Sequence, residues 1–193
     1  EKRAESGHDI LYLLQDMQDF ELYGTVRAVV SVCDSMNYVT EPEDLEYVFA
    51  LVNNYLDPGG LFIFDMNTIH KYRDVIGDRT IAEDREDGSF IWENSYDSEN
   101  ALNVYELALF LPREDGLYEK CEEEHVQKAY SIEEVKVMIA KAGMELVAVY
   151  DAYTHTPGDE NCERLTFIAR EHGKSAENDY HGNIPERTRH TEE

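Results

Sequence analysis

The chain has 193 residues, 42% of them apolar, which is enough for one domain with a sizeable core or one domain with a small annex. Against 17 Lys and Arg stand 42 Asp and Glu, so the formal net charge is −25. A negative charge of this size argues against nucleic acid or an anionic membrane as a partner, and otherwise serves mainly solubility. The 13 Tyr, 7 Phe and single Trp exclude wholesale disorder.

The cysteines and the apolar runs indicate a cellular compartment. Cys33, Cys121 and Cys162 are too widely spaced for a disulfide framework or a C-x-x-C metal site, and reduced thiols are typical of the cytosol. No run approaches the roughly 18 apolar residues of a membrane span, and the first residues, EKRAESGHD, contain no apolar signal region. The sequence therefore predicts a cytoplasmic protein without a membrane partner.

The first half of the chain alternates apolar runs with a helical pattern. Ile10–Leu14 and Arg27–Cys33 predict two buried strands. Apolar side chains then recur with helical spacing up to Leu56, and a T-x-x-E capping box that begins at Thr40 predicts the helix start, with Pro42 in its first turn.

The turn sequence DPGG ends this helix, and the run Leu61–Phe64 predicts a third strand. A strand, a helix, a tight turn and another strand, with continuous apolar strands, predict an α/β fold whose parallel sheet is covered on both faces.

The next segment, from Thr80 to Tyr130, alternates apolar and polar residues and contains turn residues at short intervals, which is typical of hairpins. It predicts an antiparallel sheet with one wet face, added to the main sheet as a layer or lid. Its strands are expected near residues 79–85, 89–97, 101–111 and 117–129.

The chain then returns to the main sheet. Ser131 and Glu134 form a second capping box, and a helix is expected from Ser131 to Ala142, ended by Gly143. Two further strands are predicted at Met144–Tyr150 and Arg164–Arg170. After Glu171 few apolar residues occur, so the tail is expected to be disordered or to serve as an arm for a partner.

No motif of metal or covalent catalysis is present in the sequence, which lacks HExxH, C-x-x-C and a glycine-rich phosphate loop. The run Glu122–His125 resembles a metal-ligand set, but on a strand its side chains alternate between faces, so a solvated strand is favoured and no metal is expected. Cys33 is a possible nucleophile, although no His is fixed near it by spacing and an inert core thiol is favoured.

Polar residues follow three of the predicted strands. They are Asp16 and Met17, then the run CDSMNY (33–38), then the run DMNT (65–68). Ligands of open α/β sheets bind beyond the carboxyl ends of the strands, so these residues are candidates for a binding site. The alternative is that Asp, Asn and Ser gather there only as turn formers.

These runs, together with LDPGG before the strand LFIFDMNT, resemble a class I S-adenosylmethionine-dependent methyltransferase. Among these enzymes the likeness is to small bacterial ones with an antiparallel sheet inserted after the fifth strand. It extends over residues 8 to 171, and LDPGG is its most specific part. The resemblance implies a Rossmann-like α/β sheet, S-adenosylmethionine as cofactor and methyl transfer to a small molecule.

The resemblance also implies roles for particular residues. Asp16 would accept a hydrogen bond from the adenine amino group, and Met17 would flank the adenine ring. Cys33 and Asp34 would lie beside the methionine part of the cofactor. Asn37 and Tyr38 would face the methyl acceptor. Three further candidates for the acceptor pocket, each of which could instead serve packing, are His70, Trp92 and Tyr130. Asp34 and His70 are the candidates for a general base, which a hydroxyl acceptor would favour.

Two parts of the family pattern are absent from the sequence: the glycine-rich loop after the first strand and the acid after the second. We therefore expect these residues to be a portion of a longer chain. The expected division is a partial cofactor-binding core (1–78), an inserted substrate or lid sheet (79–130), the return of the core (131–171) and a tail (172–193).

Two other functions remain open. A non-catalytic binding or dimerisation module would retain the fold without activity, with the inserted sheet as the contact of a homodimer. A nicotinamide-dependent oxidoreductase is less well supported, because GxGxxG and its following acid are also absent.

Overall fold

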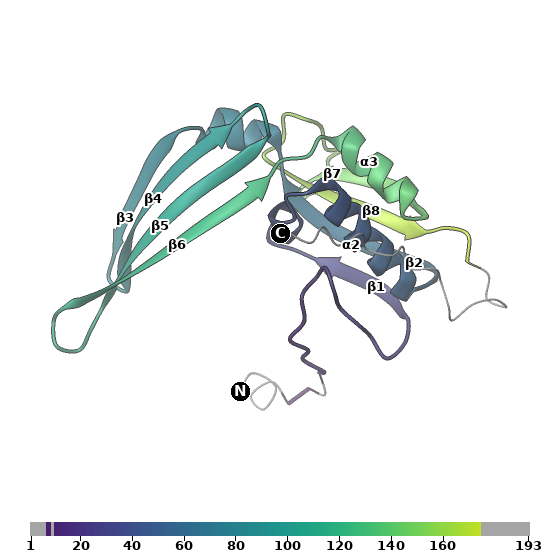
Figure 1. Ribbon diagram of the computed structural model, residues 1–193, viewed down its shortest axis with the longest axis horizontal. Helices are drawn as coiled ribbons and strands as arrows, with labels where there is room; N and C mark the ends of the chain where they lie inside the picture. Colours follow the sequence, from purple (N-terminus) through teal and green to yellow (C-terminus); the bar gives the residue numbers. More distant parts are fainter. Residues whose placement is uncertain (1–6, 9, 175–193) are drawn as a thin grey trace, which may run out of the picture.

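The computed structural model describes residues 7, 8 and 10–174, which form two four-stranded sheets (Figure 1). The core sheet has the strand order β1 (Val26–Ser31), β2 (Leu56–Asn67), β8 (Arg164–Glu171), β7 (Met144–Asp151). The inserted sheet has the order β3 (Arg79–Arg85), β4 (Gly88–Asp97), β5 (Leu102–Pro112), β6 (Tyr118–Lys128). The helices are α2 (Pro42–Tyr55), α3 (Ile132–Lys141), a 3-10 helix η1 (Ser35–Tyr38) and a π-helix η2 (Lys71–Ile76).

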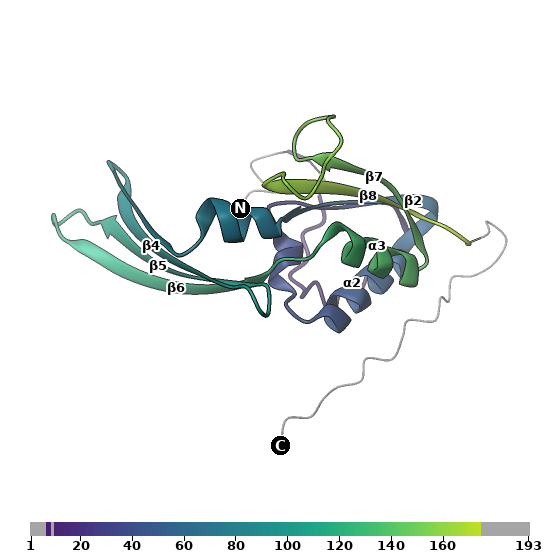
Figure 2. The ribbon, with the colours of Figure 1, turned by 90° about the horizontal axis from the view of Figure 1, so that it is seen from above.

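The β1–α2–β2 unit is parallel, as the apolar runs and the helical pattern predict, and β8 then pairs antiparallel with both β2 and β7. Helices α2 and α3 lie on the same side of the core sheet (Figure 2). Beneath them Phe49 of α2 packs against Phe62 and Phe64 of β2, and Phe64 stacks on Phe167 of β8 with 5.1 Å between ring centroids. This aromatic layer is the centre of the hydrophobic core.

The prediction that both faces of this sheet are covered is wrong for the residues that the structure describes. Val30 of β1 is 61% exposed, and β2 alternates between buried Phe62 and Phe64 and the partly exposed Ile63. Side chains alternate along a strand, and the two long helices both cover the face to which Phe62 and Phe64 point. β1, predicted as a buried strand over Arg27–Cys33, is confirmed as a strand, but it lies at the edge of the sheet and is largely exposed.

The predicted strand at Ile10–Leu14 is also wrong. The run has no regular structure, and all five side chains are exposed. A strand needs a hydrogen-bonded neighbour, and none of the strands in the described part of the chain pairs with this run. The apolar pattern alone therefore did not produce a strand.

Helix α2 begins one residue later than the capping box at Thr40 predicts. Its N-cap is Glu41, which makes no side-chain cap hydrogen bond, so the predicted box is wrong, whereas Pro42 occupies the first turn as expected. The helix ends at Tyr55, and the DPGG sequence becomes an irregular start of β2: the register moves from Val26–Leu56 to Ala28–Leu61. Gly59 has a φ of 72°, a conformation that suits glycine.

The second capping box is confirmed. Ser131 Oγ accepts a hydrogen bond from the Glu134 amide, the Glu134 side chain accepts one from the Ser131 amide, and Gly143 after the helix has a φ of 79°. The two strands expected after it are confirmed as β7 and β8.

The four strands of the inserted sheet are confirmed as well, and they form an antiparallel meander that extends away from the core sheet (Figure 1). The proposed division into domains stays a prediction. Most of the tail, residues 175–193, lies outside the described residues. Among the helices that the structure does describe, none is long and apolar enough to cross a membrane.

Candidate active site

The candidate site begins where the chain leaves β1. Cys33 and Asp34 have φ angles of 63° and 51°, a left-handed conformation that is costly for residues with a side chain. Their backbone amides donate to the carboxylate of Asp65 at the end of β2, at 3.2 Å and 2.7 Å. Asp65 is 2% exposed. Hydrogen bonds from backbone amides to a buried carboxylate are strong, so Asp65 holds the turn in this conformation.

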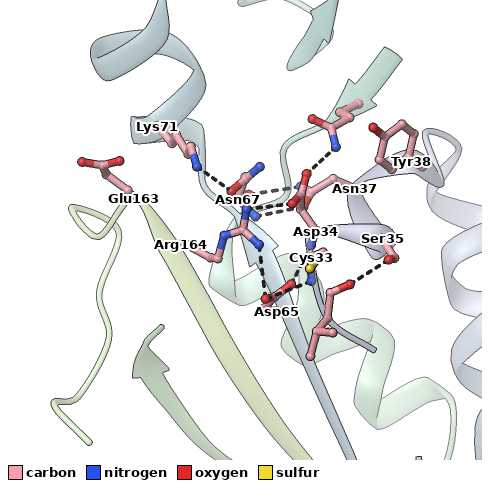
Figure 3. Close-up of polar contacts among 12 residues, drawn as sticks. Cys33, Asp34, Ser35, Asn37, Tyr38, Asp65, Asn67, Lys71, Glu163 and Arg164 are labelled. Atoms are coloured by element: carbon pink, nitrogen blue, oxygen red, sulfur yellow. Dashed lines mark hydrogen bonds and ion pairs between the residues drawn. The ribbon is translucent and has the colours of Figure 1, made fainter. Parts of the chain in front are cut away.

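Arg164, the first residue of β8, joins the two acids (Figure 3). Its Nη2 lies 2.7 Å from Asp34 Oδ1, and its Nη1 lies 3.2 Å from Asp65 Oδ2. Burial by itself would lower the pKa of Arg164, but the two carboxylates outweigh burial and raise it. One guanidinium therefore links the ends of β1, β2 and β8.

A chain of side-chain hydrogen bonds continues from Asp34 into the inserted sheet. The second oxygen of Asp34 accepts from Gln127 Nε2 at 2.6 Å, and the Tyr72 hydroxyl donates to Gln127 Oε1 at 2.9 Å. The side-chain Nδ2 of Asn67 donates to the Tyr72 hydroxyl at 3.1 Å, and its Oδ1 accepts from Lys71 Nζ at 3.1 Å. Burial raises the pKa of Tyr72 and lowers that of Lys71, so the tyrosine keeps its proton in the folded state.

Asn37 lies at the junction of the two sheets and is fully buried. Its side-chain Nδ2 donates to the backbone carbonyls of Asn67 and Lys128, at 3.1 Å and 2.8 Å. Its Oδ1 accepts from the backbone N–H of Asn67 at 2.9 Å. These contacts give Asn37 a structural role in joining β2 to β6. Its contact with an acceptor stays a prediction.

Tyr38 lies at the end of η1 and is 40% exposed. Its hydroxyl is 2.9 Å from the Tyr105 hydroxyl and 2.9 Å from His125 Nδ1. Trp92 packs on the other side of Tyr105, with 5.0 Å between ring centroids. The structure thus brings Cys33, Asp34, Tyr38 and Trp92 to the region where the end of β1 meets the inserted sheet.

The other predicted site residues lie apart from this group or face inward. Asp16 is exposed in a turn where its Oδ1 accepts from the Gln18 amide, and Met17 packs against the core. His70 is paired with Asp74 at 2.9 Å. Tyr130 is 5% exposed and donates to the Val39 carbonyl at 2.7 Å.

Several residues of the site were not predicted as members of it. Arg164 and Gln127 have no local motif, and they reach Asp34 from 130 and 93 positions along the chain. Tyr105 has no signal beyond its place on an alternating strand. His125 does have a signal, the unusual acidic run before it, but that run favours a solvated strand over a metal-ligand set and does not predict a contact with Tyr38.

The sequence and the fold have known counterparts. A protein of Bacillus subtilis (strain 168), YqeM, is 31% identical over 171 residues, which are 88% of this chain and 69% of that protein. A protein of Geobacillus sp. (strain WCH70) is 28% identical over 83% of this chain and 65% of its own length. Both are named "Putative methyltransferase". No protein-family model matches the chain.

Solved structures agree with these relatives. A crystal structure of an S-adenosylmethionine-dependent methyltransferase from Clostridium acetobutylicum ATCC 824 is 26% identical, with a TM-score of 0.83 over 89% of this chain and 69% of that one. The CcbJ methyltransferase from Streptomyces caelestis shares the fold at 13% identity, with a TM-score of 0.75 over 89% of this chain and 69% of that one.

The fold and the sequence identity together define a class I S-adenosylmethionine-dependent methyltransferase with a Rossmann-like core and an extra antiparallel sheet. The chain belongs to this family, and it spans about two thirds of the length of its two relatives. Its activity is therefore methyl transfer from S-adenosylmethionine, the cofactor of the family.

Proposed function

We propose that the methyl acceptor is a small molecule, bound between the end of β1 and the aromatic face of the inserted sheet. The observation that carries this proposal is the row Tyr38, Tyr105 and Trp92. Tyr38 is 40% exposed, and the row adjoins the strand end where the fold class binds its ligand. Aromatic rings with a few fixed polar groups are typical of small-molecule sites.

The residues present fit part of a cofactor site. The carboxylate of Asp16 is exposed and available to an adenine amino group, with Met17 beside it. The turn at Cys33 and Asp34 is fixed by Asp65 and presents the exposed Cys33. We assign Asp16, Met17, Cys33 and Asp34 to the cofactor. S-adenosylmethionine supplies an activated methyl group, and these side chains supply orientation, which is worth up to about 7–11 kcal/mol in ideal cases.

On the acceptor side, we assign Tyr38 and Trp92 to the wall of the site, with Asn37 and Tyr130 as the buried support behind it. Both oxygens of Asp34 already accept hydrogen bonds, from Arg164 and Gln127, so its geometry favours a positioning role over that of a base. His70 is held by Asp74, whose pKa is lowered by hydrogen bonds from Arg73 and His70. A role for His70 requires that it turn toward the acceptor.

Two measurements test the proposal. Isothermal titration with S-adenosylmethionine should give heat at micromolar cofactor, and its absence would contradict cofactor binding and favour a non-catalytic module. With the methyl-tritiated cofactor and a bacterial extract as acceptor source, label should appear in the low-molecular-weight filtrate. Label confined to the macromolecular fraction would overturn the small-molecule acceptor.

Asp16→Ala tests the cofactor assignment. We expect the free energy of cofactor binding to become less favourable by about 1–3 kcal/mol, the usual cost of losing the partner of a buried hydrogen bond. The hydrogen bond would be buried because bound adenine would cover the carboxylate. Titration calorimetry measures the change. Asp19→Ala, an exposed acid in the same loop, is the matched control and should bind normally. Equal affinities of the two variants would place the adenine elsewhere.

We also propose that a second copy packs against the outer half of the inserted sheet. Ile81 of β3 and Leu107 and Leu111 of β5 lie on the same face of the sheet, and Ile81 and Leu111 are 37% and 44% exposed. The charge of −25 opposes association, so sedimentation should show a dimer that strengthens with added salt. Leu111→Asp should weaken it. A wild-type protein that stays monomeric at high concentration and high salt would exclude this contact.

A further inference from the structure

His125 and Glu123 of β6 lie beside the proposed acceptor site, and the proposed function gives them no role. His125 Nε2 is 3.1 Å from Glu123 Oε2, and His125 Nδ1 is 2.9 Å from the Tyr38 hydroxyl. The two residues are on the same face of β6, two positions apart. Carboxylate, imidazole and phenol therefore form a continuous line that ends at the exposed Tyr38.

The partners of the imidazole decide which nitrogen carries its proton. Glu123 can only accept a hydrogen bond when ionised, so Nε2 must donate to it, and in the neutral ring Nδ1 is then a bare acceptor. The Tyr38 hydroxyl accordingly donates to Nδ1. The Tyr105 ring stacks on His125 with 4.6 Å between ring centroids and an interplanar angle of 12°, which fixes the plane of the imidazole.

The groups around the imidazole favour proton movement toward it. Tyr105 from β5 donates to Tyr38, and burial together with this hydrogen bond raises the pKa of Tyr105. Tyr105 therefore keeps its proton and stabilises negative charge on the Tyr38 oxygen. Glu123 stabilises positive charge on the ring. Asp34 adds negative charge near Tyr105. Arg164 is paired with Asp34, whereas no Lys or Arg forms a salt bridge with Glu123 in the part of the chain that the structure describes.

We propose that His125 is the general base of the reaction and that Tyr38 relays the proton to it, which implies an acceptor with a hydroxyl or amine group. The proposal rests on the proposed function. The acceptor oxygen or nitrogen forms a bond to the methyl carbon while the carbon–sulfur bond breaks and its electron pair stays on sulfur. The acceptor proton passes to the Tyr38 oxygen, and the Tyr38 proton passes to His125 Nδ1. The positive charge lost from sulfur ends on the imidazolium beside Glu123.

The first test needs no acceptor. Nitrogen-15 NMR of the imidazoles, assigned by comparison with His125→Gln, should show His125 in the neutral form with its proton on Nε2. Glu123→Ala should move the ring toward a mixture of the two neutral forms. A proton on Nδ1 in the wild-type protein would overturn the proposal, because that nitrogen could not accept a proton from Tyr38.

The second test uses the tritium transfer to the low-molecular-weight filtrate. His125→Ala should lower the rate about 100-fold or more, with cofactor affinity unchanged by calorimetry, and added imidazole should restore part of it. Tyr38→Phe should also transfer the methyl group slowly, but added imidazole should not restore its rate of transfer. His172→Ala, an exposed histidine next to Gly143 and outside the site, should transfer at the wild-type rate. Normal transfer by His125→Ala would overturn the proposal while leaving the function intact, whereas absence of cofactor heat in the wild type would contradict the function itself.

Discussion

Among single residues, Arg164 makes the most consequential contacts of the site. It is the charge partner of Asp65, which is 2% exposed, and of Asp34. Arg164→Met would leave a buried carboxylate without a counter-charge. Breaking a buried pair in this way costs about 3–5 kcal/mol, and urea unfolding should show a loss of that size.

Arg85→Met is the control for this prediction. Arg85 pairs with Glu83 on the surface of β3, with both side chains well exposed, so the free energy of unfolding should stay close to the wild-type value. If Arg164→Met were as stable as Arg85→Met, the bridge between the strand ends would contribute nothing to the fold.

The same residues show how far the sequence predicts the site. Cys33, Asp34 and Tyr38 are predicted as site residues because they follow an apolar strand, and ligands of open α/β sheets bind beyond the carboxyl ends of the strands. The structure brings all three to one region. Arg164 and His125 cannot be predicted in this way, because they contact Asp34 and Tyr38 from 130 and 87 positions away along the chain. Contacts of that kind depend on how the two sheets meet, and no local pattern encodes that arrangement.

At the level of secondary-structure elements, the two predicted capping boxes give a direct comparison. The box at Ser131 has both of its hydrogen bonds, whereas Thr40 lies before the N-cap Glu41 and caps nothing in α2. Ser131→Ala should therefore destabilise the protein by about 0.5–2 kcal/mol, and Thr40→Ala should have a smaller effect. Thermal or urea unfolding of the two variants makes the comparison. Equal losses would show that the hydroxyl of Ser131 is not an effective cap.

Local patterns predicted elements well where neighbouring residues supply the partners. The hairpins of the inserted sheet and the box at Ser131 depend on residues close in sequence, and both are confirmed. The run Ile10–Leu14 has an apolar pattern as strong as that of β1, but a strand also needs a paired neighbour, which only the tertiary structure can supply. The same dependence explains why coverage of both faces of the core sheet could not be predicted from apolar strands.

At the scale of the whole molecule, the two sheets are joined, among the described residues, by a small set of side-chain hydrogen bonds. The stability of the fold therefore depends on the chemistry of these side chains. Asn37 links the end of β2 to the end of β6 through backbone groups, and Tyr72 links η2 to Gln127 of β6. Asp34 contacts both Gln127 and Arg164, which places a site residue within the same set of contacts. Stability and site geometry should therefore be lost together when this junction is disturbed.

The pH dependence of stability tests the junction at Tyr72. Burial raises the pKa of Tyr72 above its ordinary value of about 10, so above that pH the unfolded chain loses this proton while the folded chain keeps it. The folded state then binds more protons, and the free energy of unfolding should fall as pH rises, by up to about 1.4 kcal/mol per pH unit for this group. Below about pH 10 this contribution is fully present.

Urea unfolding between about pH 9 and pH 11 measures this slope, with the ordinary tyrosine value near the middle of the range. In Tyr72→Phe the free energy of unfolding should fall less steeply with pH than in the wild type, because one titrating proton has been removed. This holds whatever the stability of the variant at neutral pH. Tyr118→Phe, which removes a hydroxyl from a side chain that is 63% exposed, should keep the wild-type slope. If the free energy of unfolding falls equally with pH in Tyr72→Phe and in the wild type, Tyr72 ionises in the folded protein. Its hydrogen bond to Gln127 then cannot hold the sheets together at alkaline pH.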